Sequence, residues 1–305
     1  MRKKRKKKLV MMAFTILGIG IVVLTIDFFI VRKIAMDRFS IYEAKAKSVT
    51  TSYGKISYID EGRGEPFLIC HGITGGYDQG FDVMSGRTDD YRIIAPSRFG
   101  YPGTDIPDNA TVDMQVEAYI ELLDELGIEK TFVTATSAGG TVAQRFVLMH
   151  PERCKGLILY CSGYPAQKKP SEPVSGMTGP PAFFCNDFAM WMISPLFKPM
   201  MGMERNVIKQ IMPMKERKAG IVFDGDVVNK DHINNYDNYD LKNIQVPVLI
   251  IHSEDDKLAD SEKAKYWSKE IPNCKSVFFS GGGHLMTGNS VEINQILDVF
   301  VEENK

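Results

Sequence analysis

The sequence lacks the cysteine spacing that marks a zinc site or a disulfide framework. Its five cysteines are odd in number, are scattered over the 305 residues and include no CxxC pair. They are Cys70, Cys154, Cys161, Cys185 and Cys274. Isolated cysteines of this kind are typical of small buried hydrophobic positions. We therefore predict neither a metal site nor a disulfide scaffold.

The sequence also lacks a P-loop, a dinucleotide-binding fingerprint and any internal repeat. Gly18 and Gly20 lie in a long apolar run, whereas a dinucleotide fingerprint opens a helix directly after a buried strand. We therefore expect the protein to work without a bound cofactor.

Acidic residues are absent from the first part of the chain, where positive charge is concentrated. Residues 2–8 are seven consecutive lysines and arginines. Without them the chain holds 30 basic and 38 acidic residues, a net charge of −8. Because nucleic-acid binding needs a basic surface, we do not expect the main part of the chain to bind nucleic acid.

Charge is then absent from Leu9 to Ile26, and the apolar run resumes at Phe28–Val31 after Asp27. About 20 apolar residues suffice to span a bilayer, and no clear small-x-small cleavage site follows. We predict an uncleaved signal anchor over residues 9–31, with Asp27 near the lipid headgroups. A cleaved signal peptide and a basic targeting tail on a buried helix are the alternatives.

The charge difference across this run predicts its orientation. The seven positive residues precede it, whereas only Arg32, Lys33 and Arg38 follow closely. The positive-inside rule therefore places residues 1–8 in the cytoplasm and the large domain outside it. We expect residues 32–46 to be a tether, and a chain that begins near Ala44 to be soluble and active.

From Lys47 onward, short apolar strands alternate with amphipathic helices. The predicted strands are Lys47–Tyr53, Lys55–Asp60, Phe67–Cys70, Arg92–Pro96, Thr131–Ala135, Gly156–Cys161, Val246–His252 and Ser276–Phe279. One predicted helix begins at the N-cap Thr111 and ends at Gly127, and another covers roughly Val291 to Glu302. This alternation predicts an α/β domain over residues 47–305, built on a mostly parallel, doubly wound sheet.

Residues from about 165 to 239 interrupt this alternation. They open with a segment rich in proline and serine and then become crowded with methionine, phenylalanine and tryptophan, without a strand period. We predict an inserted helical cap over the carboxyl edge of the sheet. Its methionines and aromatic residues either line an apolar substrate pocket or pack the core of the cap itself.

The segment Ala135-Thr-Ser-Ala-Gly139 joins a predicted strand to a predicted helix. A sharp strand-to-helix turn exposes its central side chain, here Ser137, and requires small residues two positions away on either side. The Ala138 amide and the helix N-terminus then face any negative charge that forms near the serine oxygen. We predict Ser137 to be a nucleophile; the alternative is an ordinary turn serine.

Hydrolysis by a serine needs a histidine that accepts its proton and an acid that orients the histidine. His284 follows three glycines just beyond the last predicted strand, at the carboxyl edge of the sheet. The acid is expected after the penultimate strand, where Glu254, Asp255 and Asp256 stand together. We choose Asp256, although its two neighbours have nearly the same reach.

These motifs, in this order, resemble those of the α/β-hydrolase superfamily from about Lys47 to the C-terminus, outside the cap. The resemblance rests on His71-Gly72, Gly100-Tyr-Pro-Gly-Thr104, Ala135-Thr-Ser-Ala-Gly139, Ser253-Glu-Asp-Asp256 and Gly282-Gly-His284. It implies that the amides of Ile73 and Ala138 form the oxyanion hole. The usual Gly-His-Ser is Ala-Thr-Ser here, which keeps the turn small. A serine nucleophile argues against the dehalogenase and epoxide-hydrolase branches, which use aspartate.

The sequence therefore predicts a membrane-anchored serine hydrolase that cleaves a carboxylic ester with an acyl or other hydrophobic group. An aminopeptidase or amidase would share this core and would need an acidic anchor for the amino group of its substrate. Four acids of the cap region offer such an anchor: Asp187, Glu204, Asp224 and Asp226. A non-catalytic binding protein derived from a hydrolase is the third possibility.

Overall fold

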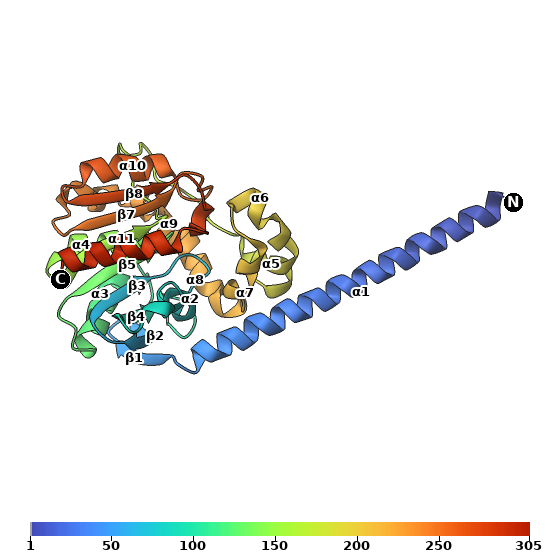
Figure 1. The fold of residues 1–305 in the computed structure, drawn as a ribbon, viewed down its shortest axis with the longest axis horizontal. Helices are drawn as coiled ribbons and strands as arrows, with labels where there is room; N and C mark the ends of the chain where they lie inside the picture. The colour runs from blue at the N-terminus through green and yellow to red at the C-terminus, as the bar shows by residue number, and fades with distance from the viewer. Residues whose placement is uncertain (1) are drawn as a thin grey trace.

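A computed structural model describes residues 2–305 and the side chains of residues 4–305. Residue 1 and the side chains of residues 2 and 3, which belong to the predicted cytoplasmic tail, lie outside this description. Figure 1 shows a body built on one twisted sheet and a single long helix, α1 (Arg2–Glu43), that projects away from it.

The sheet has eight strands in the order β1-β2-β4-β3-β5-β6-β7-β8. Only the β1–β2 and β2–β4 pairs are antiparallel, and the remaining pairs are parallel. The strands are β1 (Lys47–Thr51), β2 (Gly54–Gly62), β3 (Glu65–Cys70), β4 (Tyr91–Pro96), β5 (Thr131–Thr136), β6 (Cys154–Tyr160), β7 (Val248–Ser253) and β8 (Cys274–Phe279). The predicted mostly parallel sheet is confirmed.

Helices cover both faces of the sheet, because successive residues of its buried strands point to opposite sides. On one face, Val133 and Leu157 pack with α3 (Val112–Glu125), α4 (Gly139–Met149) and α10 (Ser261–Glu270). On the other face, Phe132 and Ile158 pack with α2 (Tyr77–Asp82) and α11 (Ser290–Glu303). The two apolar cores confirm the doubly wound arrangement.

The stretch between β6 and β7 is a helical insertion, as predicted. Its α-helices are α5 (Asp187–Ile193), α6 (Phe197–Met201), α7 (Ile208–Ile211), α8 (Lys218–Phe223) and α9 (Asn229–Asn234). Met190, Trp191, Phe197 and Ile208 are buried together in a separate core. Many of its methionines and aromatic residues therefore stabilise the helical cap itself.

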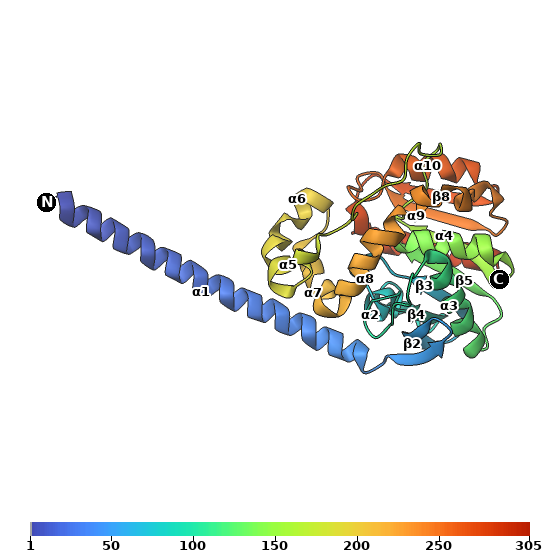
Figure 2. The same cartoon turned by 180° about the vertical axis from the view of Figure 1, so that it is seen from behind.

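Helix α1 has two parts with different surroundings. Its residues 9–26 are exposed and apolar, and α1 is long and apolar enough to cross a membrane. Its last part lies along the body (Figure 2), where Val31, Ala35 and Phe39 are buried. Helix α1 thus covers residues 32–43 of the expected tether, and Ala35 and Phe39, four positions apart, lie on its buried face, whereas Ile34 and Ile41 are exposed.

Candidate active site

Ser137 lies in the turn between β5 and α4, which are both built as the sequence predicts. Its φ angle is 54°, in the left-handed region that is uncommon and strained for a residue with a side chain. The turn is tight because a Cβ atom at Gly139 would come within 2.1 Å of the Cys70 carbonyl oxygen. Gly139, two residues after the serine, therefore lets α4 approach the end of β3.

His284 and Asp256 meet at the carboxyl edge of the sheet. His284 lies in a short 3₁₀ turn, η10 (Gly283–Leu285), after β8, and Asp256 lies in the loop after β7. The His284 Nδ1 atom is 2.8 Å from Asp256 Oδ2 and 3.0 Å from Oδ1. With Nδ1 held in this way, Nε2 is the nitrogen left to exchange a proton with a nucleophile.

Ser137 is not joined to this pair by a hydrogen bond within the part of the chain that the structure describes. Catalytic hydrogen bonds are often long before substrate binds and shorten in the complex. The assignment of Ser137, His284 and Asp256 as one catalytic unit therefore stays a prediction.

The three candidate acids have different contacts. Asp255 Oδ1 accepts hydrogen bonds from Ser253 Oγ at 2.6 Å and from the Gly283 amide at 2.8 Å, and these bonds lower the pKa of Asp255. Glu254 pairs with Lys265 at 2.8 Å. Of the three, only Asp256 contacts the imidazole of His284, which favours the predicted choice.

Asp256 is held in the charged form. Its side chain is fully buried, and burial alone would raise its pKa. The His284 hydrogen bond and charge, together with the Leu258 and Ala259 amides, outweigh burial and lower the pKa of Asp256. A buried carboxylate with this many donors can orient a histidine and stabilise its protonated form.

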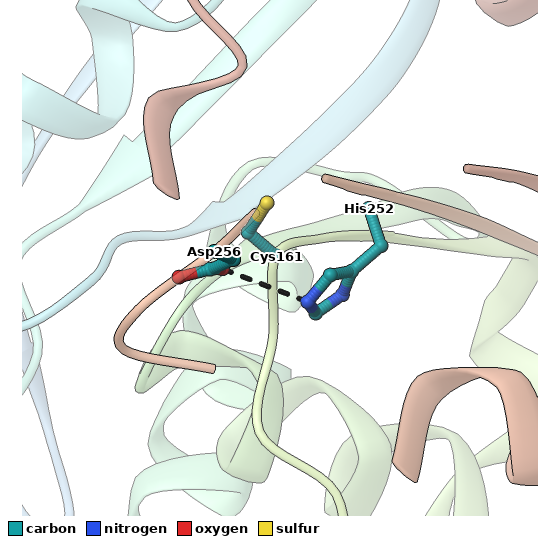
Figure 3. A group of neighbouring side chains, drawn as sticks. All are labelled: Cys161, His252 and Asp256. Atoms are coloured by element: carbon teal, nitrogen blue, oxygen red, sulfur yellow. Dashed lines mark ion pairs between the residues drawn. The ribbon is translucent and has the colours of Figure 1, made fainter. Parts of the chain in front are cut away.

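Two further buried groups face Asp256 (Figure 3), and sequence analysis missed both. His252 Nε2 lies 3.5 Å from Asp256 Oδ2, and burial lowers the pKa of His252, so its ring is neutral at neutral pH. Cys161 lies beside them, directly after β6. The spacing of four residues between His252 and Asp256 was the available signal, but in a strand-to-loop segment that spacing does not imply contact.

Cys161, His252 and Asp256 lie close enough together to suggest a metal site, with ligand atoms within 4.8 Å of one another. Their chemistry does not suit one. Burial and the charge of Asp256 raise the pKa of the Cys161 thiol, so it stays protonated, whereas metals bind the thiolate. Asp256 already accepts hydrogen bonds from His284 and two amides. We therefore interpret Cys161 and His252 as neutral groups that pack around the Asp256 carboxylate.

The predicted oxyanion amides belong to two adjoining turns. Ile73 lies in residues 71–76, the loop after β3 that we call the His71 loop. A Cβ atom at Gly72 would lie 3.3 Å from Ser137 Cβ, so this loop passes directly beside the serine. Within the described residues, neither the Ile73 nor the Ala138 amide donates a hydrogen bond to another protein group. Both are therefore available to a ligand, as the prediction requires.

His71 fixes the start of its loop as a neutral ring. Its Nδ1 donates to the Gly72 carbonyl at 2.8 Å, and its Nε2 accepts from the Arg98 amide at 2.9 Å. Burial and the Arg98 charge lower the pKa of His71 well below its ordinary value. The neutral form satisfies both contacts, which a doubly protonated ring would break.

The middle of the loop is fixed from a second side. The Tyr101 hydroxyl donates to Asp224 Oδ2 at 2.6 Å and accepts from the Thr74 amide at 3.3 Å. Arg98 pairs with the same Asp224, and both side chains are buried. Because Asp224 belongs to the helical cap, this cluster links the cap to the His71 loop.

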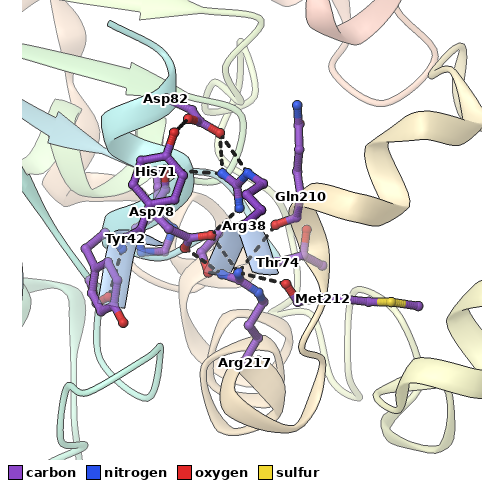
Figure 4. A network of polar contacts seen from close by, with 12 residues as sticks. Arg38, Tyr42, His71, Thr74, Asp78, Asp82, Gln210, Met212 and Arg217 are labelled. Atoms are coloured by element: carbon purple, nitrogen blue, oxygen red, sulfur yellow. Dashed lines mark hydrogen bonds and ion pairs between the residues drawn. The ribbon is translucent and has the colours of Figure 1, made fainter. Parts of the chain in front are cut away.

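A third contact reaches the loop from the cap and is shared with α1 (Figure 4). Arg217 of the cap donates to the Gly75 carbonyl, and it pairs with Asp78 of α2 at 2.8 Å. Arg38 of α1 pairs with the same Asp78 at 2.7 Å. Burial opposes ionisation of Asp78, but the two guanidinium groups lower its pKa and keep it charged. Sequence analysis gave no signal for this three-way contact, because its residues come from segments far apart in the chain.

Most of the acids that offered an amino-group anchor have other partners. Asp187 pairs with Arg32 at 3.0 Å, Glu204 pairs with Lys198 at 2.6 Å, and Asp224 pairs with Arg98. Asp226 is exposed on the cap surface. The basic partners neutralise three of the four carboxylates that an aminopeptidase would need to bind the amino group of its substrate.

Comparison with known sequences finds similarity to hydrolases. Residues 65–184 match the protein family described as the alpha/beta hydrolase fold. The uncharacterized hydrolase YcgS of Bacillus subtilis is 33% identical over 115 residues, which make up 38% of this chain and 40% of that protein. The chain spans about 40% of the length of the first curated relatives that it matches. The uncharacterized carboxylesterase nap of B. subtilis is 22% identical over 268 residues, covering 82% of this chain and 85% of that protein.

Solved structures extend the likeness to the whole body. A thermophilic esterase from Thermogutta terrifontis superimposes with a TM-score of 0.65 at 21% identity, covering 85% of this chain and 99% of its own. At this identity the likeness concerns the fold. The sheet order, the strand-to-helix turn at Ser137 and these matches show that the chain has the α/β-hydrolase fold.

Proposed function

We propose that the protein is a serine hydrolase that cleaves carboxylic esters through an acyl-enzyme intermediate. The observation that carries the proposal is the contact between His284 Nδ1 and Asp256, at the sheet edge where the strained Ser137 turn also ends. This order of nucleophile, acid and histidine along the chain is the order that the fold uses.

The reaction proceeds in two steps. The Ser137 oxygen attacks the ester carbonyl while His284 Nε2 takes its proton, and the Ile73 and Ala138 amides stabilise the oxyanion. As the intermediate collapses, His284 protonates the leaving alcohol and an acyl-serine forms. Water, deprotonated by His284, then attacks the acyl group and releases a carboxylic acid and free Ser137.

An ester bond is favoured over an amide for two reasons. The acids that would bind an amino terminus are largely paired with arginine or lysine. The relatives of similar length are named a carboxylesterase and an esterase. The apolar composition of the cap favours a substrate with an acyl chain or another hydrophobic group.

Residues 9–31 form the proposed signal anchor, with residues 1–8 inside the cytoplasm and the catalytic domain outside. The apolar, exposed part of α1 supports a membrane span, and the seven preceding positive charges support the orientation. External protease should remove the domain from intact cells while cytoplasmic markers survive. Protection that is lost only on lysis would place the domain inside.

Covalent labelling tests the hydrolase itself. A fluorophosphonate probe should label the wild-type chain, and Ser137→Ala should abolish labelling with little loss of stability. Labelling that survives in Ser137→Ala would refute this nucleophile. A wild-type chain that resists the probe and does not hydrolyse p-nitrophenyl esters would favour a non-catalytic binding protein.

A further inference from the structure

One side of the helical cap exposes a row of large apolar side chains. The row lies on a continuous helical segment made of α5, the 3₁₀ turn η4 (Ser194–Leu196) and α6. Its side chains are spaced four residues apart, so they lie on one side of the segment. Its members, which we call the apolar stripe, are 51–65% exposed: Phe188, Met192, Leu196 and Met200. The opposite side of the segment is buried in the core of the cap. An exposed apolar row of this kind marks an interaction surface.

The apolar stripe continues the exposed surface of α1. The Phe28 ring of α1 lies edge-on to Phe188, with the ring centroids 5.5 Å apart. Residues 9–26, just before Phe28, are the exposed apolar part of the helix. Figures 1 and 2 both show α5 and α6 on the side of the body toward which α1 projects. An apolar phase that surrounds the apolar part of α1 would therefore also contact the apolar stripe.

Polar contacts mark where that apolar surface ends. Asp27 accepts a hydrogen bond from Trp191 Nε1 at 2.9 Å and pairs with Arg205 of the cap. Tryptophan and arginine side chains are typical of the headgroup region of a bilayer, where one end of the side chain is apolar and the other is hydrated. The level of Asp27 along α1 is thus suited to the membrane interface, and Phe188 lies at the same level.

We infer that the apolar stripe docks on the bilayer that holds α1, in the leaflet next to the domain, so that the cap rests on the membrane surface. This surface goes beyond the proposed ester hydrolysis and rests on the proposed membrane span. A helix face with bulky apolar side chains inserts about 5–10 Å into the boundary between headgroups and acyl chains.

The docked segment also touches the loops of the candidate site. Lys257, next to Asp256, donates to the Pro199 carbonyl of α6 at 3.1 Å. Gly202, directly after α6, packs against Gly283, the neighbour of His284. Docking therefore brings the catalytic loops close to the membrane surface, and it favours esters that partition into the bilayer over esters dissolved in water.

Lipid-quenching fluorescence on the full chain tests the docking. Cys274 is the least buried native cysteine, so Cys274→Ala provides the background for single labelled positions. A bimane label is placed at Met192→Cys or Met200→Cys in phosphatidylcholine vesicles that contain doxyl-labelled phosphatidylcholine. Leu17→Cys reports the membrane span. Val299→Cys, an equally exposed apolar position on α11, is the matched control.

The stripe labels should be quenched roughly twofold by shallow doxyl groups, as expected for side chains at the acyl boundary, with no change at Val299→Cys. Quenching at Leu17→Cys without quenching on the stripe would overturn the docking and leave the anchor intact. An unquenched Leu17→Cys would overturn both. Stripe labels shielded from lipid and also from aqueous iodide would assign the surface to a second copy or another protein, and would also overturn the inference. Hydrolysis of a water-soluble short ester, measured on the same samples, reports the proposed activity independently.

Discussion

Arg38 of α1 and Asp78 of α2 form a partly buried contact of 2.7 Å that joins the long N-terminal helix to the segment after the His71 loop. Asp78 is fully buried and shares its charge between Arg38 and Arg217. Because Arg217 also donates to the Gly75 carbonyl, the position of the His71 loop depends on α1 as well as on the cap.

Removing Arg38 should therefore weaken the fold near the site. Arg38→Ala leaves Asp78 with one cationic partner in place of two, and we expect a loss of about 1–3 kcal/mol, below the cost of leaving a buried charge with none. Urea unfolding of the full chain in detergent micelles measures this loss. Lys33→Ala is the matched control, since its pair with Asp37 is exposed and should contribute less than about 1 kcal/mol. Equal effects of the two variants would contradict the role of Asp78.

The packed end of α1 also changes where the chain can be shortened. A chain that begins at Phe28 keeps Val31, Ala35 and Phe39, whereas one that begins at Ala44 exposes the surfaces that these side chains bury. Burial of each larger apolar side chain contributes about 1.5–3 kcal/mol, so the shorter chain should unfold several kcal/mol more easily. Thermal unfolding followed by tryptophan fluorescence compares the two. Equal melting temperatures would restore the expectation that residues 32–46 are only a tether.

Paired amide substitutions separate the neighbouring acids. Asp256→Asn should lower kcat by about 10⁴, because the histidine then loses the carboxylate that sets its tautomer. Asp255→Asn should have a much smaller effect on kcat, since Asp255 bonds Ser253 and the Gly283 amide instead of the His284 ring. Steady-state kinetics on a p-nitrophenyl ester gives both values. The opposite ranking would make Asp255 the catalytic acid.

Stability should fall as the pH drops below about 6.5, because several histidines are buried in the neutral form. Burial lowers the pKa of His232 to about 3, whereas the pKa of a histidine in an unfolded chain is about 6.5. The contribution of His232 to the free energy of unfolding is therefore complete above pH about 6.5. It decreases as the pH falls toward the pKa of His232 in the folded chain. Between pH 7.5 and pH 5 this costs about 2 kcal/mol for one histidine. His71 and His252, whose pKa values burial also lowers, act in the same direction.

His232→Phe keeps a ring against Tyr239 and removes the titration. The free energy of unfolding of this variant should change less between pH 7.5 and pH 5 than that of the wild-type chain, by about 2 kcal/mol. Urea unfolding at both pH values measures the difference. Parallel pH curves would show that the buried His232 ring does not oppose protonation.

The sequence predicts those parts of the fold whose signal is local. Apolar runs mark the strands, and Thr111 and Gly127 mark the ends of α3: the Thr111 hydroxyl accepts from the Met114 amide, and Gly127 takes a positive φ of 64°. The order Ser137, Asp256, His284 follows from motifs beside strand ends. Such features need only neighbouring residues and the rule that parallel strands end at one edge.

The features that the sequence does not predict depend on contacts between distant segments. From the sequence, the apolar residues of α1 directly after Asp27 are assigned to the predicted membrane span. Only the fold shows that Val31 and Phe39 pack on the body. Apolar residues occupy both faces of the cap helices, so the sequence does not distinguish the buried face from the exposed one. The contact of His252 with Asp256 likewise depends on the path of a loop.

Helix α1 runs unbroken from Arg2 to Glu43, so its exposed apolar part passes into its packed part without a flexible joint. With that part in a bilayer, the enzyme moves as a rigid body in two dimensions and cannot swing away from its membrane. Encounters with substrates in the same plane are then set by surface density, which raises their effective concentration relative to free solution. The rate of such an enzyme should depend on its number per unit area of membrane, and diluting the cells or vesicles should leave it unchanged.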